Sequence, residues 1–115
     1  MNKETYLYFA QNEGANAAGD CMVYPASSFM GIDSASTTSL NISMKTRSGN
    51  LTNDSIGFTG LTAGKFKSVC EALAIIMNSQ NAGLVIVADE DNTVYHKELT
   101  SRGAAPATVT IALDS

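Results

Sequence analysis

The sequence carries little charge, and most of that charge is acidic. Charged residues make up 16% of the 115 positions, and only 7 of them are Lys or Arg against 11 Asp and Glu. An average soluble domain has roughly 25% charged residues. Nucleic-acid-binding proteins need a basic surface to neutralise phosphates, and a formal net charge of −4 argues against one. We therefore expect no nucleic-acid partner.

Long apolar runs are also missing. No stretch approaches the ~20 apolar residues of a membrane span. The apolar run Tyr6–Phe9 is too short for the hydrophobic region of a secretion signal, and no clear cleavage site follows it. We expect synthesis in a cytoplasm and no membrane partner.

Cysteine and histidine are too scarce for most catalytic or metal sites. Cys21 and Cys70 are expected to be two buried free thiols, with one disulfide as the alternative. His96 has no cysteine or histidine at metal-ligand spacing. Segment 60–66 lacks the spacing of a phosphate-binding loop, and segment 89–92 lacks the glycine of a calcium loop. We expect no enzymatic activity, no cofactor and no metal.

Small neutral polar residues replace the missing charge. Ser, Thr and Asn occur 12, 11 and 9 times, which is 32 of 115 positions. Such a surface repels itself weakly and is typical of a protein that lies against another protein. The chain is 44% hydrophobic, with a mean hydropathy of +0.02, and its length fits a single domain over residues 1–115.

Strand patterns dominate both ends of the chain. Strict alternation in Ser39–Lys45 predicts a strand with Leu40, Ile42 and Met44 on its buried face. The unbroken apolar run Leu84–Ala88 predicts a central strand, buried on both faces and lying under a helix. Further strands are expected at 5–10, 21–24, 56–58, 93–99 and 108–113. Pro25 limits the strand at 21–24 to an edge or an end of the sheet, and segment 27–33 is expected to continue that strand after a bulge.

The middle of the chain has the period of an amphipathic helix. Its apolar stripe consists of Phe66, Val69, Cys70, Leu73, Ile76 and Met77. We expect a helix from Ala63 to about Gln80, with Thr62 as its N-cap. The predicted fold class is α+β: a mostly antiparallel sheet or sandwich of about six or seven strands with this one helix packed on it. One helix cannot cover such a sheet on both faces, so a second layer or another chain must cover the rest.

Three segments carry a family resemblance. The helix begins with Thr62-Ala63-Gly64-Lys65-Phe66-Lys67 and ends in Met77-Asn78. Segment 83–89 is a glycine and aliphatic residues ending in Ala-Asp, and segment 23–31 contains a Val-Tyr-Pro-Ala-Ser stretch. In these features the chain resembles small virion structural proteins of marine tailed bacteriophages, including cyanophages. The motifs are structural, so no catalytic residue is carried over.

The resemblance implies a place in the virion after synthesis in the host bacterial cytoplasm. We expect a capsid decoration or cement protein that binds the assembled shell in many copies and stabilises it. Its partners would be the major capsid protein and copies of itself, as a trimer or dimer. A tail, neck or fibre component and a small cytoplasmic ligand-binding or regulatory domain remain alternatives. The residues expected at interfaces are Tyr6, Tyr8, Ala15, Asn16, Tyr24, Pro25, Phe29, Val109 and Ile111.

Overall fold

The computed structural model describes residues 5–11, 21–45, 53–78 and 83–112. Within them the chain forms eight strands, two α-helices and one short 3-10 helix. The strands are β1 (Thr5–Ala10), β2 (Cys21–Pro25), β3 (Phe29–Ser36), β4 (Ser39–Lys45), β5 (Asn53–Thr59), β6 (Gly83–Asp89), β7 (Val94–Tyr95) and β8 (Thr108–Ala112). The helices are η1 (Ala26–Ser28), α1 (Phe66–Met77) and α2 (Lys97–Thr100). The predicted α+β class is confirmed, with slightly more strands than expected.

The strands divide into two four-stranded sheets. Sheet A has the order β2-β1-β6-β7, and sheet B has the order β3-β4-β5-β8. All neighbours are antiparallel except β1 and β6, which are parallel because the chain crosses back through α1 between them. Strand β1 lies inside sheet A, between β2 and β6, so it offers no free edge.

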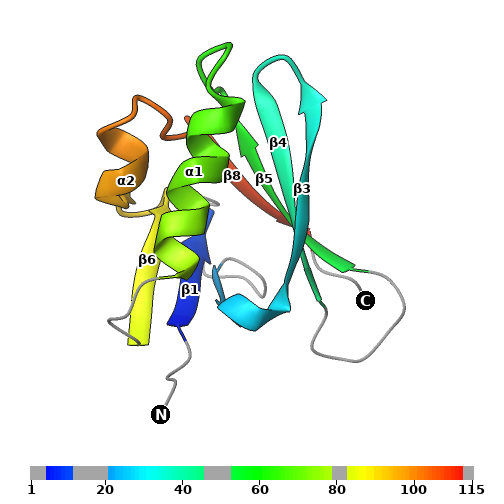
Figure 1. Cartoon of the computed structure of the whole chain (residues 1–115), viewed down its shortest axis with the longest axis vertical. Helices are drawn as coiled ribbons and strands as arrows, with labels where there is room; N and C mark the ends of the chain where they lie inside the picture. The colour runs from blue at the N-terminus through cyan, green and yellow to red at the C-terminus, as the bar shows by residue number, and fades with distance from the viewer. Residues whose placement is uncertain (1–4, 12–20, 46–52, 79–82, 113–115) are drawn as a thin grey trace.

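The described residues form one hydrophobic core cluster, with members on both sheets and on α1, and Figure 1 shows how these elements are arranged. Sheet B contributes Leu40, Ile42 and Met44, so the burial predicted from their alternation is confirmed. The two sheets meet directly where the ring of Phe9 on β1 lies 6.3 Å from that of Phe58 on β5. The outer faces of both sheets are left to solvent or to a partner.

One buried hydrogen bond links the two sheets inside the core. The hydroxyl of Tyr24 on β2 donates to Oδ2 of Asp54 on β5 over 2.7 Å. Tyr24 is 0% exposed and Asp54 is 4% exposed, so solvent hardly reaches this contact. Tyr24, which we had expected at an interface, is therefore a core residue.

Helix α1 is shorter than its apolar pattern suggested. It begins at Phe66, after an N-cap at Lys65 that makes no side-chain hydrogen bond, and Thr62 does not cap it. The positive φ of 86° at Gly64 fits this late start, because it breaks the helical path just before Lys65. At the other end the helix stops at Met77, and the expected end near Gln80 lies outside the described residues.

The buried stripe of α1 is rotated away from Cys70. Val69, Leu73 and Ile76 are buried together with Ala72, whereas Cys70 is exposed. At about 100° per residue, Cys70 lies a quarter turn from Val69 and so falls beside the stripe. Cys21 is exposed as well, and both thiols are free. The expectation of buried cysteines is wrong.

Strand β6 is buried on one face only. Val87 is fully buried, but Leu84 is 62% exposed and Ile86 is 38% exposed. The prediction of burial on both faces is wrong, because α1 and sheet B cover the inner face of sheet A and nothing in the described chain covers the outer one.

The segment after β6 is a short hairpin followed by a helix, whereas a strand was predicted through residue 99. Strand β7 pairs with β6 through two residues and ends at Tyr95. The Nδ1 atom of His96 then accepts a hydrogen bond from the backbone N–H of Glu98 and caps α2. Leu99, fully buried, anchors this turn of helix in the core.

Candidate interaction surface

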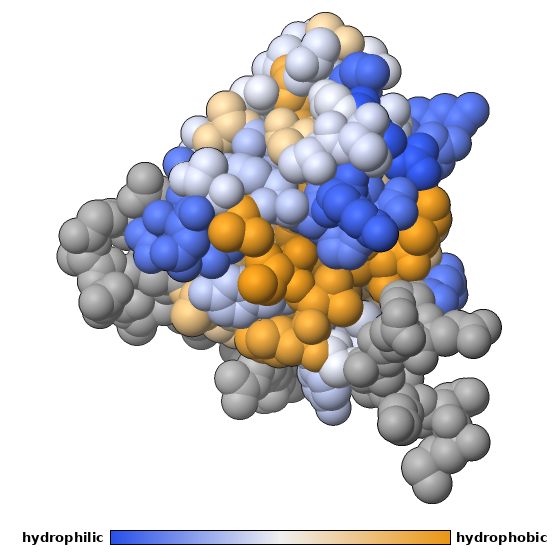
Figure 2. Space-filling model, turned by 90° about the vertical axis from the view of Figure 1, so that its left-hand side faces the viewer, coloured by the Kyte–Doolittle hydropathy of each residue, from blue (hydrophilic) through white to orange (hydrophobic). Residues whose placement is uncertain are grey.

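The outer face of sheet A is a continuous apolar surface. The alternation of side chains along the strands places two rows of three residues there, and each row crosses β2, β1 and β6. We call the six residues of these two rows the apolar face. The first row is Pro25, Tyr6 and Leu84, and the second is Val23, Tyr8 and Ile86. Figure 2 shows hydrophobic residues gathered over the side of the molecule on which β6 lies in Figure 1.

Exposure of this face is high for apolar residues. Tyr6 is 43% exposed, Val23 41% and Leu84 62%, while Tyr8 and Pro25 are half-buried. Scattered exposed apolar side chains are normal on a protein surface, but a contiguous patch of them marks a contact site. None of the six carries a charge at neutral pH, so the face also lacks the residues that would keep it hydrated.

The hydroxyl of Tyr8 lies near acidic residues at one end of the apolar face. Burial raises the pKa of the Tyr8 hydroxyl, and the nearby carboxylate of Asp89 and thiol of Cys21 raise it further. A tyrosine hydroxyl with the ordinary pKa of 10.0 is already protonated at neutral pH, so this shift leaves Tyr8 uncharged. Asp89 ends β6 and pairs with Ala10, two residues beyond Tyr8 on β1, so the turn that contains Asp89 and Asp91 lies at this end of the apolar face.

The free edge of β8 is closed by side chains. The backbone N–H of Val109 donates to Oε1 of Glu90 over 2.8 Å, and that of Ile111 donates to Oε1 of Gln11 over 2.7 Å. Both donors would otherwise be available to an added strand. In the structure, the amides of Val109 and Ile111 are already satisfied within the same chain.

The other three edge strands are also poor templates for pairing. Strand β3 contains two register shifts, at Met30 and Ala35, which interrupt its regular hydrogen bonding. Strand β2 ends in Pro25, which has no N–H to donate, and β7 has only two residues. Contact with another protein is therefore better served by the sheet faces than by the edges.

The outer face of sheet B has a different character. It contains a shallow depression of about 250 Å³, and its lining residues are Asn41, Ser55, Gly57, Thr59, Thr110 and Ala112. All are small or neutral, so part of the Ser, Thr and Asn excess of the sequence gathers here. Gly57 forms the floor, because a Cβ there would lie 3.4 Å from Oδ1 of Asn41 and 3.7 Å from Cβ of Thr110.

The structure places only part of the predicted interface on the apolar face. Tyr6, Tyr8 and Pro25 lie on it. Four others lie in or against the core: Tyr24, Val109 and Ile111 are buried, and Phe29 packs against the buried cluster. Ala15 and Asn16 lie outside the described residues.

Sequence reasoning missed Val23, Leu84 and Ile86 as surface residues. Val23 is the neighbour of the buried Tyr24 on the same strand, and neighbouring residues of a strand point to opposite faces of the sheet. This alternation could have placed Val23 on the face that points away from the core. Leu84 and Ile86 gave the opposite signal, because a run of consecutive apolar residues normally indicates two covered faces. Their exposure follows from the tertiary arrangement alone.

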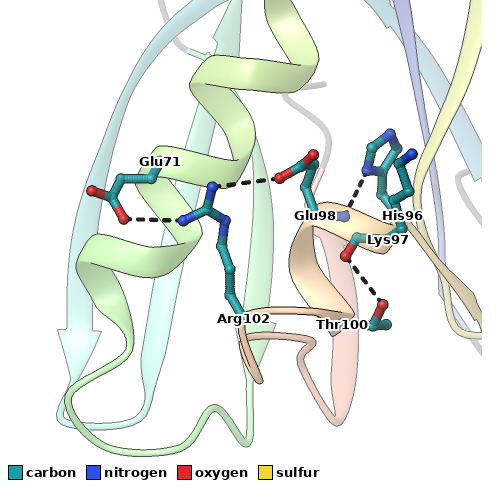
Figure 3. A network of polar contacts seen from close by, with 6 residues as sticks. All are labelled: Glu71, His96, Lys97, Glu98, Thr100 and Arg102. Atoms are coloured by element: carbon teal, nitrogen blue, oxygen red, sulfur yellow. Dashed lines mark hydrogen bonds and ion pairs between the residues drawn. The ribbon is translucent and has the colours of Figure 1, made fainter.

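The most connected polar cluster ties α1 to the segment after β7 (Figure 3). The guanidinium of Arg102 makes ion pairs of 3.2 Å with Glu71 on α1 and 3.4 Å with Glu98 on α2. The Nε atom of Arg102 is buried and has no hydrogen-bond partner among the described residues. His96 points away from this cluster and caps α2. The cluster therefore consists of ion pairs that hold α1 and α2 together, without a histidine among them.

The chemistry available to His96 is limited by its role as a cap. Burial lowers its pKa below the usual value of 6.5, with smaller effects from Glu98, which raises it, and Lys97, which lowers it. Nδ1 must be unprotonated to accept the Glu98 N–H, which places the ring proton on Nε2. In the described part of the chain, no three His, Cys, Asp or Glu side chains come together as metal ligands.

Comparisons with known proteins add no relative. No family model, no curated protein and no solved structure matches the chain. Among the described residues, no helix has the length and apolar character needed to cross a membrane.

Proposed function

We propose that this protein is a non-enzymatic structural component of a bacteriophage particle, most simply a capsid decoration protein that binds the assembled shell in many copies. The observation that carries the proposal is the apolar face of sheet A, which the described chain leaves uncovered. The low charge of the sequence supports it, as does the resemblance of segments 23–31, 61–78 and 83–89 to virion proteins.

The mechanism is burial of surface between repeated copies. Removing apolar area from water contributes about 25 cal/mol per Å², so each contact of modest size is weak on its own. A particle presents many equivalent sites at fixed spacing, and contacts made simultaneously reinforce one another. The depression of neutral residues on the outer face of sheet B and the apolar face of sheet A give one chain two surfaces for such contacts.

Quantitative mass spectrometry of purified particles tests the proposal. A decoration protein is expected at tens to hundreds of copies, measured against the major capsid protein of the same particles. Isolated tails should lack it, and a tail, neck or fibre component would instead appear there at low copy number. Absence of the chain from purified particles would refute every virion role.

A binding experiment connects the particle result to the surface. Particles stripped of the chain are incubated with purified protein, either wild-type, Leu84→Lys or Ile75→Lys. Leu84 is 62% exposed on the apolar face, whereas Ile75 is 47% exposed on α1. We expect Leu84→Lys to reduce bound protein strongly and Ile75→Lys to leave it unchanged, because both add one positive charge and only the first lies on the apolar face.

A further inference from the structure

We propose that the apolar face of sheet A is covered by a second copy of this chain, packed face to face in a two-fold symmetric dimer. The inference deepens the proposed function and rests on its premise that many copies assemble together. It names the occupant of the surface, and it leaves the outer face of sheet B exposed on both sides of the pair for contact with the shell.

The pattern of β6 indicates a missing cover. Leu84 and Ile86 belong to an unbroken apolar run of the kind found where both faces of a strand are buried. Among the described residues nothing covers one of those faces, and Leu84 is their most exposed large hydrophobic residue. A second sheet packed at the usual distance of about 10 Å would bury it.

The distribution of charge favours a copy of the same chain. The net charge is −4, so two copies repel each other wherever acidic residues meet. The six residues of the apolar face carry no charge, and the acidic turn with Asp89 and Asp91 lies at only one of its ends, beside Tyr8. We place the two-fold axis in the plane of the contact, running across the strands and passing between the Tyr6 row and the Tyr8 row. This axis holds the two acidic turns at opposite ends of the dimer.

The same axis brings aromatic residues together at the centre. Tyr6 and Tyr8 are the middle members of the two rows, so each Tyr6 lies opposite the Tyr8 of the other copy. Tyrosine is enriched at protein interfaces because its ring buries apolar area while its hydroxyl finds a polar partner.

The size of the face sets the strength of the dimer. Strands lie about 4.8 Å apart with a rise of about 3.4 Å per residue, so the backbone beneath the two rows spans about 10 Å across the three strands and about 7 Å along them, and the side chains extend beyond this outline. Such a patch presents on the order of 300–400 Å², and a pair of copies buries roughly 600–800 Å². Stable interfaces begin near ~1,200 Å², so the dimer is weak in dilute solution and forms where copies are held close together.

The edges of the sheets determine that association stops at two copies. Growth by strand addition needs a free edge, and β8 is capped by Glu90 and Gln11 while β3 is interrupted by register shifts. Contact through the same face of both partners uses up that face in each copy. The result is a closed pair and not a fibre.

Sedimentation equilibrium from about 10 μM to about 1 mM protein tests the proposal. The wild type should fit a monomer–dimer equilibrium. Leu84→Lys on β6 and Val23→Lys on β2 should each raise the dissociation constant at least about tenfold, because each places charges inside the contact. Ile75→Lys, an equally charged change on α1, should leave it within about twofold. Circular dichroism confirms folding, and the two face variants lie on different strands, so one suffices if the other fails to fold.

Several results would overturn the dimer. The dimer is refuted if the wild type stays monomeric up to the highest concentration, or if its first oligomer is a trimer. It is also refuted if Ile75→Lys raises the dissociation constant as much as Leu84→Lys does. The outcome is separable from the proposed function. If the protein forms the dimer in solution but is absent from purified particles, the virion role is refuted and the dimer is not. A chain abundant in particles yet monomeric in solution at all concentrations refutes the dimer alone, and the apolar face then binds the shell.

Discussion

Removing the hydroxyl of Tyr24 should destabilise the protein far more than removing that of Tyr6. Tyr24→Phe deletes the donor of the 2.7 Å hydrogen bond to Asp54 and leaves a carboxylate oxygen in the core without it. Tyr24 is 0% exposed and Asp54 is 4% exposed, so water cannot take over the lost contact without a rearrangement. Hydrogen bonds to charged groups contribute about 1.5–3 kcal/mol, which we expect as the loss in free energy of unfolding.

Urea denaturation measures this loss directly. With a denaturant dependence of about 1.5 kcal/mol per M for a domain of this size, the unfolding midpoint should fall by roughly 1–2 M. Tyr6→Phe is the matched control, because it removes a hydroxyl from a tyrosine that is 43% exposed. Its unfolding free energy should stay within about 0.5 kcal/mol of the wild type. Equal midpoints for the two variants would show that the cross-sheet hydrogen bond contributes nothing, and the reasoning from burial would fail.

Two further predictions concern the loops that join the sheets to the helices. Gly60→Ala should cost more unfolding free energy than Gly64→Ala, by about 1–3 kcal/mol in urea titrations, because both have positive φ but only at Gly60 would the new Cβ lie 2.5 Å from Cβ of Ala107. Equal losses would mean that backbone strain alone matters at both sites. Stability should also fall as the pH drops below 6.5, because the pKa of His96 is lowered in the folded state and the unfolded chain then binds more protons. The same titration on His96→Asn, which can still cap α2 but does not titrate, should lack this component, and identical pH profiles for the two proteins would contradict it.

The sequence was informative wherever one face of an element meets the core. Leu40, Ile42 and Met44 alternate because β4 is covered on one side only, and the structure buries all three. The helix could be located for the same reason, although its ends could not. Capping depends on backbone geometry near Lys65 that composition does not encode.

The candidate surface could be predicted only in part, because it depends on which strands become neighbours. Tyr6 and Leu84 share a row only because β1 pairs with β6, which no local pattern specifies. The apolar run of β6 indicates that its faces are covered, but it does not distinguish cover by the same chain from cover by another. The capping of the β8 edge could not be predicted for a similar reason, because its caps come from the distant residues Glu90 and Gln11.

The pairing of β1 with β6 also has a consequence for how the chain acquires its structure during synthesis. Strands β3, β4 and β5 pair with their sequence neighbours, so this meander can form as soon as it emerges from the ribosome. Strand β1 appears first, and one of its two partners, β6, appears only after α1. Throughout that interval the side of β1 that pairs with β6 has no strand partner. Translation of residues 83–89 is therefore the step at which sheet A can close, and a nascent chain halted before it keeps the meander without the surface on which assembly would depend.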